Sequence, residues 1–301
     1  MAKKQTTKFS IFHIEGGLGK HVAATAVAKC IKNNYPDREL IIVCAYPEIF
    51  LNLEYIDRVY RIGHTPYFYQ DFIKNKDFLI FKHEPYFTTE HINQTLPLIE
   101  NWCKLYNLEY SGESPELVFN IRQQQYGINK WSRSKPILLI QTHGGPLNDQ
   151  PYQYSWTRDI PYHIAEKIVN AFSQEYHVIQ ICRNEAQAIP GAEAIFHPLS
   201  NLDLISILAA SEKRILIDSS LQHAAAALNL SSTVLWVGTS YKAFGYDLHT
   251  NIVANPPKHK PKLINSYLFD YNFEGWPEQC PYDTPLEMFN LEKIIKSITT
   301  I

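Results

Sequence analysis

Residues 14–25 bring an acid, two basic side chains and three glycines into one short stretch, which reads IEGGLGKHVAAT. The stretch follows the apolar run FSIFHI and precedes a helical pattern. Glu15, Lys20 and His21 can transfer protons or bind an anion. Backbone amides at the start of a helix favour anions, and glycines let a ligand approach them closely. The stretch therefore predicts either a phosphate site or a site of proton transfer.

A nucleotide-binding P-loop is one interpretation of this stretch. The standard loop needs a glycine where Ile14 stands and a serine or threonine where His21 stands. The deviant loop of ParA-like ATPases agrees better, and the matching residues are Gly16, Gly17, Gly19 and Lys20. However, its leading lysine is Glu15 here, and its magnesium-binding hydroxyl is again His21. A ParA-like ATPase is therefore the weaker alternative, and a tight turn without a ligand also fits the pattern.

A second group of polar residues lies in the segment 215–240, ILIDSSLQHAAAALNLSSTVLWVGTS. An apolar strand-like run ends at Asp218, and Ser219 and Ser220 then open a helix that contains His223. Hydroxyl side chains and free amides at a helix start suit a diphosphate. An ordinary helix cap explains the same residues if no ligand binds. Gly238 ends the next strand-like run and would lie close to this group.

Other polar residues also follow predicted strands of the second half. His143 and Gly144 come after the run PILLIQT, and Arg183 comes after HVIQIC. Arg158 lies in the loop between these runs. Arginine binds phosphate in a bidentate way, and glycine leaves room for a ligand beside the backbone. These residues are further candidates for binding an anionic ligand.

The elements that must position these residues alternate between strand and helix patterns. Near-continuous apolar strands separated by helices predict parallel sheets that are covered on both faces. The first half has strand patterns at 8–14, 39–46, 57–62 and 77–83, and the second half restarts the alternation at 136. Residues 112–136 are polar and read as the connection. Ligands of such sheets bind beyond the carboxyl ends of the strands, where the candidates above lie.

Composition excludes several other classes of protein. The 301 residues include 28 basic and 30 acidic side chains, so the net charge of −2 argues against an obligate duplex nucleic-acid partner. Five cysteines are scattered singly, as in a reducing compartment. The sequence has no apolar run long enough for a membrane span and no secretory signal. A cytoplasmic enzyme is the expectation; the oligomeric state is left open.

The segment 215–240 resembles the donor site of the ADP-heptose:lipopolysaccharide heptosyltransferase family, glycosyltransferase family nine. In that family a strand ends in Asp-Thr/Ser-Gly and continues x-x-His-x-x-Ala-Ala-Leu. The matching residues are Asp218, Ser219, His223, Ala226, Ala227 and Leu228, with Ser220 in place of the glycine. Residues 234–240 are similar to the family's V-x-L-F-G-P-T stretch, and SWTRDIPYHIAEKIVNAF resembles its segment around a Trp-Pro, which here includes Trp156. The resemblance spans about residues 8–62 and 136–250.

The resemblance implies an α/β protein with the GT-B fold, in which two Rossmann-like α/β/α domains with parallel sheets face a central cleft. We expect an acceptor domain at 1–132, a nucleotide-sugar domain at 133–282, and a C-terminal helix at 283–301 that crosses back to the first domain. The implied activity is inverting transfer of a heptose-like sugar from a nucleotide-diphosphate sugar to a glycan or other hydroxyl acceptor. ADP is the expected nucleotide, with no metal and no other cofactor.

The sequence departs from the family at two charged positions. Lys20 stands where the family has the aspartate proposed as base, and Tyr154 stands where it has a diphosphate-binding lysine. Lys20 is therefore predicted to anchor the diphosphate, with Glu15, His21 or Glu84 as the base. Alternatively, the protein binds a nucleotide-sugar and has lost transfer.

Overall fold

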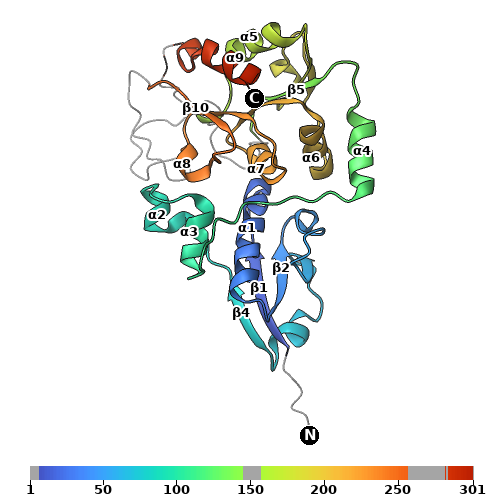
Figure 1. Ribbon diagram of the computed structural model, residues 1–301, viewed down its shortest axis with the longest axis vertical. Helices are drawn as coiled ribbons and strands as arrows, with labels where there is room; N and C mark the ends of the chain where they lie inside the picture. The colour runs from blue at the N-terminus through green and yellow to red at the C-terminus, as the bar shows by residue number, and fades with distance from the viewer. Residues whose placement is uncertain (1–6, 145–156, 257–281, 283, 301) are drawn as a thin grey trace.

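The computed structural model describes residues 7–144, 157–256, 282 and 284–300. Within them the chain forms two α/β units, one above the other in Figure 1. The first contains a sheet of four strands in the order β3-β2-β1-β4, and the second a sheet of six in the order β10-β9-β8-β5-β6-β7. Every strand pair in both sheets is parallel. The predicted α/β class with two parallel sheets is confirmed.

The elements of the first unit follow the predicted alternation closely. Its strands are β1 (Lys8–Ile14), β2 (Glu39–Cys44), β3 (Arg58–Arg61) and β4 (Asp77–Phe81). Its helices are α1 (Leu18–Asn34), η1 (Pro47–Ile49), η2 (Tyr69–Ile73), η3 (Pro85–Phe87), α2 (Thr89–Ile92) and α3 (Leu98–Leu105). The segment between β4 and the crossing to the second unit forms two helices, α2 and α3, and not one. Pro97 is the N-cap of α3, because proline has no amide hydrogen to donate within a helix.

The sheet of the first unit is covered on both faces, which explains its apolar strands. Phe12 and Ile14 belong to one buried cluster with α1 and with Trp102 of α3. Phe9 and Ile11 point to the other face, where Phe72 of η2 packs against them. Alternate residues of β1 are thus buried on opposite faces of the sheet, as expected for a parallel strand.

The second unit contains the larger sheet. Its strands are β5 (Ile137–Gln141), β6 (His177–Ile181), β7 (Glu193–Ile195), β8 (Lys213–Ile217), β9 (Thr233–Trp236) and β10 (Thr250–Val253). Its helices are α5 (Tyr162–Phe172), η5 (Glu185–Gln187), α6 (Asn201–Ala210), α7 (Ser220–Ala227), α8 (Tyr241–Phe244), η6 (Pro285–Glu287) and α9 (Leu291–Thr300). α6 and α7 cover one face, while α5 and α9 cover the other.

The connection between the units contains a helix that the sequence analysis missed. α4 (Ile121–Trp131) lies in the segment read as a polar connection, and it packs against α6 of the second unit (Figure 1). Asn120 and Gln123 form a capping box at its start, and this Asn-x-x-Gln spacing was the available signal. α4 precedes the predicted boundary at residue 132 and yet joins the second unit; the domain limits stay a prediction.

The prediction that the C-terminal helix crosses back to the first unit is wrong for the described residues. α9 packs against α5, β8 and β9, and it lies beside α5 in Figure 1. Ile294 and Ile298 are buried in the cluster that covers the second sheet, and the Ser297 and Thr233 hydroxyls are 2.8 Å apart. The amphipathic face of the helix was visible in the sequence, but the sheet that receives it was not.

Alanine at Ile294 should lower the free energy of unfolding by about 2–4 kcal/mol, because the side chain is completely buried among α5 and β8 residues. Urea unfolding monitored by circular dichroism measures the change. Lys293→Ala, on the exposed side of α9, is the control and should change stability by less than about 0.5 kcal/mol. Equal effects of the two substitutions would contradict this packing.

Candidate functional site

The glycine-rich turn joins β1 to α1 and brings the two units into contact. Gly16 has φ +96°, a conformation that glycine adopts without strain, and Gly17 is the N-cap of α1. At Gly19 a Cβ atom would lie 2.9 Å from His223 Cδ2 and 3.1 Å from the Ser220 Cα atom. The start of α1 therefore packs directly on the start of α7. The two glycine and serine motifs of the sequence meet at the junction of the units.

Lys20 has a different partner from the one predicted. Its ammonium group forms an ion pair with Glu84, which follows β4, and lies 5.4 Å and 5.5 Å from the ring centres of Tyr86 and Trp102. Only 8% of the lysine side chain is exposed, against 32% for Glu84. A cation that is enclosed and neutralised in this way is not free to anchor a diphosphate. The carboxylate is the more accessible member of the pair.

His21 is a structural residue and not an accessible base. It is completely buried, and its Nδ1 atom lies 2.9 Å from the Gly17 carbonyl oxygen. Its Nε2 atom accepts a hydrogen bond from the Ala45 amide at 3.1 Å. Burial lowers the pKa of this imidazole, so it stays neutral. Both ring nitrogens are used to join α1 to the end of β2, which removes His21 from the candidates.

Glu15 and Glu84 stand at the carboxyl ends of neighbouring strands. β1 and β4 pair in parallel, so the residues that follow them share one edge of the sheet. Glu15 is 60% exposed, and its carboxylate lies 3.6 Å from His13 Nδ1. Burial, and then the charge of Lys82, lower the pKa of His13. Two carboxylates are thus available at this edge, one exposed and one positioned by Lys20.

The residues that the sequence predicts to bind a diphosphate lie at the carboxyl end of β8. The Ser219 hydroxyl accepts from the Leu221 amide at 3.3 Å and donates to Gln141 Oε1 at 2.5 Å. Asp218 lies 3.7 Å from Arg158 Nε. No hydrogen-bond partner for that Nε atom exists among the described residues, and the atom is buried. Side chains from three segments therefore lie at the start of α7: Asp218 with Ser219, Arg158, and Gln141.

His223 is held within α7 by a residue that the sequence analysis missed. Its Nδ1 atom is 2.8 Å from the Tyr246 hydroxyl, and burial lowers its pKa to about 4. The imidazole is consequently neutral near neutral pH. When Tyr246 donates to Nδ1, the proton of the ring resides on Nε2, which makes Nε2 a donor. Tyr246 has no sequence signal of its own, because it lies in an aromatic loop 23 residues further along the chain.

The residues after β5 and β6 form a second charged group. Arg183 binds Asp159 in a bidentate way, at 2.5 Å and 2.9 Å, and the Gly144 amide donates to the same carboxylate at 3.1 Å. His143 Nδ1 lies 2.7 Å from the Thr142 hydroxyl. Asp159, which sequence reasoning missed, thus holds Arg183 and the backbone at Gly144 together.

Gly238 and Trp156 complete the predicted set. The Gly238 amide donates to the Thr157 carbonyl oxygen at 2.7 Å, and a Cβ atom there would lie 2.8 Å from Thr157 Cβ. Glycine is therefore needed for close packing of the loop after β9. Trp156 lies outside the described residues. No group of three or more His, Cys, Asp or Glu side chains that could hold a metal occurs in the described ranges.

A buried imidazole closes the junction on the side of α2. Both ring nitrogens of His91 are buried without a hydrogen-bond partner in the described part of the chain. The ring makes edge contacts with Tyr86 and with Phe244 of α8, and the distances between ring centres are 5.2 Å and 5.5 Å. Burial lowers its pKa, so the unfolded chain binds more protons than the folded chain at acidic pH. The contribution of His91 to stability therefore falls as the pH falls below the ordinary histidine range.

His91→Phe should stabilise the protein by about 1 kcal/mol at about pH 8, since the unsatisfied polar atoms disappear. The gain should be larger at about pH 5, because protonation of His91 in the unfolded chain lowers the stability of the parent there. Urea unfolding at the two pH values measures both. His197→Phe on the surface is the control. An equal gain at both pH values would show that His91 does not contribute to the acid sensitivity.

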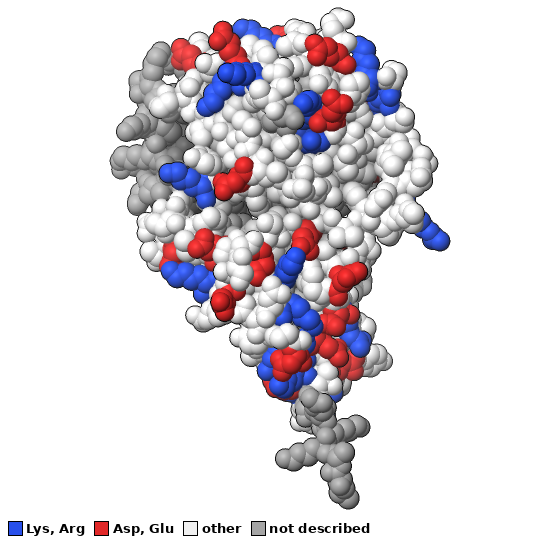
Figure 2. Space-filling view, viewed as in Figure 1, with Lys and Arg blue, Asp and Glu red and all other residues white. Residues whose placement is uncertain are grey.

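On the face shown in Figure 2, no broad patch carries charge of one sign. Figure 2 shows basic and acidic side chains intermixed over the first unit, and a mainly uncharged surface where the second unit faces the viewer. None of the described helices is both long and apolar enough to cross a membrane. The geometry therefore directs attention to the junction of the units.

The chain shares its fold with known glycosyltransferases. No protein-family model and no curated protein sequence matches it. A family 9 glycosyl transferase from Veillonella parvula has a TM-score of 0.69 and 12% identity, covering 100% of this chain and 98% of that one. The ADP-heptose lps heptosyltransferase II of Escherichia coli has a TM-score of 0.66 and 13% identity, covering 97% of this chain and 99% of that one.

A third similar structure is TibC of enterotoxigenic E. coli, described as an iron-containing dodecameric heptosyltransferase and solved with ADP-D-β-D-heptose. That complex has a TM-score of 0.64 and 14% identity, covering 99% of this chain and 77% of that chain. The two-unit architecture is thus the GT-B fold of the heptosyltransferases, as the sequence resemblance implied. At such identities the likeness concerns the fold.

Proposed function

We propose that the protein is a glycosyltransferase that transfers a sugar from a nucleotide-diphosphate sugar to a hydroxyl acceptor. The observation that carries the proposal is the meeting of α1 and α7 in a heptosyltransferase fold. The first turn of α1 supports the proposal, because its Lys20 pairs with Glu84 and its Gly19 packs on Ser220 at the start of α7. The second unit would hold the donor, and the first unit the acceptor.

The donor diphosphate would bind at the start of α7. The Ser220 amide and the positive end of the helix favour an anion, while the Leu221 amide already donates to the Ser219 hydroxyl. Arg158 lies beside Asp218, and its buried Nε atom lacks a hydrogen-bond partner within the described ranges. His223, neutral and held by Tyr246, would donate from Nε2. These groups would stabilise the charge that develops on the leaving diphosphate.

Glu84 is the residue that we propose as the base. The family resemblance puts an aspartate where Lys20 stands, and here the lysine instead binds Glu84, which follows β4. The carboxylate would thus come from the segment after β4 and not from α1, with Lys20 as the positioning residue. The acceptor oxygen would attack the anomeric carbon and give its proton to Glu84. The bond from that carbon to the diphosphate oxygen would break, with inversion.

ADP is the proposed nucleotide, and a heptose-like sugar the proposed donor group, because similar structures are described with ADP or ADP-heptose. Thermal-shift measurements with ADP, GDP, UDP and CDP test the nucleotide. Mass spectrometry of products from ADP-heptose and cell-envelope acceptors tests transfer. A thermal shift with ADP and a product with added heptose mass are expected. Failure of all four nucleotides to stabilise the protein would overturn the proposal.

A nucleotide-sugar-binding protein without transfer activity is the second candidate. The observation in its favour is the ion pair itself, because Lys20 already occupies a carboxylate oxygen of Glu84 that would otherwise be open to an acceptor hydroxyl. ADP binding without any product would favour this candidate. A ParA-like ATPase has less support, since the enclosed and neutralised Lys20 is not free to bind a nucleotide phosphate.

A further inference from the structure

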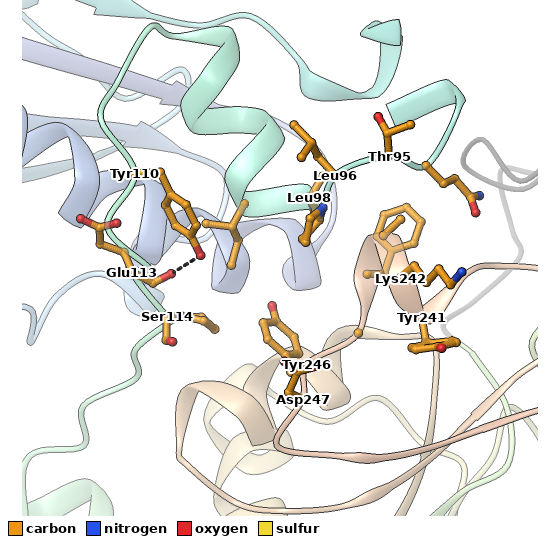
Figure 3. Close-up of a pocket in the computed structure, with 17 residues that line it drawn as sticks. Thr95, Leu96, Leu98, Tyr110, Glu113, Ser114, Tyr241, Lys242, Tyr246 and Asp247 are labelled. Carbon is orange, nitrogen blue, oxygen red and sulfur yellow. Dashed lines mark hydrogen bonds between the residues drawn. The ribbon is translucent and has the colours of Figure 1, made fainter. Parts of the chain in front are cut away.

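A cavity of about 450 Å³ lies between the two units, beside the junction of α1 and α7. Its volume is within the range of small-molecule sites, about 300–1,000 Å³. Three segments surround it: residues 94–99 at the start of α3, residues 110–115 between α3 and α4, and residues 241–247 around α8. Figure 3 shows the first two segments facing the third across the open space. Both units therefore contribute to its walls.

The side chains around the cavity combine aromatic rings with uncharged polar groups. Tyr110 and Ser114 come from the first unit, and Tyr241, Phe244 and Tyr246 from the second. In Figure 3 Tyr246 extends between the two sides, and the Tyr110 hydroxyl donates to the Glu113 carbonyl oxygen at 3.3 Å. A pyranose ring has an apolar face of C–H groups and a rim of hydroxyls. Aromatic faces and hydroxyl partners match both parts of such a ring.

The charges around the cavity give it no excess of positive charge that would attract an acidic ligand. Lys242 and Asp247 contribute one charge of each sign. The carboxylate of Glu113 points away from the open space in Figure 3, and it accepts hydrogen bonds from the Ser111 amide and Asn33. A phosphate or a sugar acid would therefore meet no net positive charge on the cavity walls.

The cavity borders both parts of the proposed site. Tyr246, on its wall, is the residue that holds His223 of α7. Phe244, also on its wall, contacts His91, which contacts Tyr86 next to the Lys20 ammonium group. Tyr246 therefore lies between the cavity and His223 on one side, and Phe244, His91 and Tyr86 lie in succession between the cavity and Lys20 on the other.

We propose that this cavity binds an uncharged sugar unit of the acceptor, adjacent to the unit that is glycosylated. The assignment of this sugar to the acceptor rests on the proposed function, whereas the fit of a sugar ring rests on the side chains of the cavity alone. It assigns a neutral oligosaccharide as the acceptor class. Acidic or phosphorylated sugars would find no net positive charge here, because Lys242 is offset by Asp247.

Two substitutions alter the cavity without removing buried side chains. Ser114→Trp adds an indole at an exposed position of the wall, and Tyr241→Ala removes an aromatic ring that is 39% exposed. Tyr162→Ala is the matched control, because Tyr162 is 40% exposed and lies on α5, away from the cavity. The full-length protein and each variant are applied to a printed array of neutral bacterial oligosaccharides and their uronic-acid or phosphate-bearing counterparts.

Binding of the parent to neutral oligosaccharides, weakened at least tenfold by each cavity variant and unchanged in Tyr162→Ala, is the expected result. Stronger binding of acidic sugars, equal binding by the cavity variants, or no binding to any glycan would overturn the inference. The thermal shift with ADP, measured on the same samples, separates the two proposals. Cavity-dependent glycan binding without an ADP shift would support the cavity site and reject the proposed donor.

Discussion

Glu84→Gln should reduce sugar transfer by a factor of about 10² or more, while ADP still raises the melting temperature as in the parent. The amide cannot accept the proton of the acceptor hydroxyl, and it lies on the unit opposite the start of α7. Product formation from ADP-heptose, followed by mass spectrometry, measures the first effect. Thermal shift measures the second.

The same substitution should also lower stability, which must be separated from the chemical effect. It leaves the Lys20 ammonium group, 8% exposed, without its carboxylate. Leaving a buried charge unpaired costs several kcal/mol, and because Glu84 is one-third exposed we expect about 2 kcal/mol. Removing both charges with Lys20→Met and Glu84→Gln together should recover most of this loss. The double variant should nevertheless remain inactive.

Glu15→Gln is the control for the neighbouring strand end, where the carboxylate is 60% exposed and unconnected to Lys20. It should retain transfer within about threefold of the parent. If Glu15→Gln abolished transfer and Glu84→Gln did not, the base would be Glu15. If the double variant regained activity with its stability, neither the charge of Glu84 nor its proton-accepting role would be needed.

The sequence allowed the two parallel sheets to be predicted because their strands bury both faces. The residues of β1 were identified in full, and α7 begins at Ser220, where the sequence predicted that a helix opens. Such elements are encoded locally, in apolar runs, glycines and cap residues. β7, β10 and α8 were missed, because each has only three or four residues and no clear period.

The partners of charged side chains could not be predicted in the same way. Lys20 and Glu84 are 64 positions apart, and nothing near either residue indicates that they pair. His21 occupies a helix position that the sequence places beside a cleft, yet the ring points inward to the amide of Ala45. For α9, the apolar face was evident, but both sheets offer an apolar surface. Tertiary packing determines these partners, and local patterns in a single sequence do not indicate which distant residues pack together.

Gly19→Ala should reduce transfer by about 10²-fold, because the contact between α1 and α7 sets the distance between the two halves of the proposed site. The new methyl group would lie 2.9 Å from His223 Cδ2 and 3.1 Å from Ser220 Cα, so either the helices separate or the imidazole moves. In an isolated helix the same change would be favourable, since alanine has the higher helix propensity. A loss of activity therefore reports on the contact and not on α1 itself.

Gly17→Ala is the matched control, because it adds the same methyl group two residues earlier, at a position with nothing within 4 Å. Its φ of −79° is accessible to alanine, so transfer and ADP binding should remain close to those of the parent. Small-angle X-ray scattering of Gly19→Ala should show a larger radius of gyration if the units separate. If Gly19→Ala instead transferred sugar as fast as Gly17→Ala, the packed junction would not be the arrangement in which the reaction occurs. The units would then have to open before the donor and the acceptor meet, and the position of Glu84 relative to α7 would be set by the substrates.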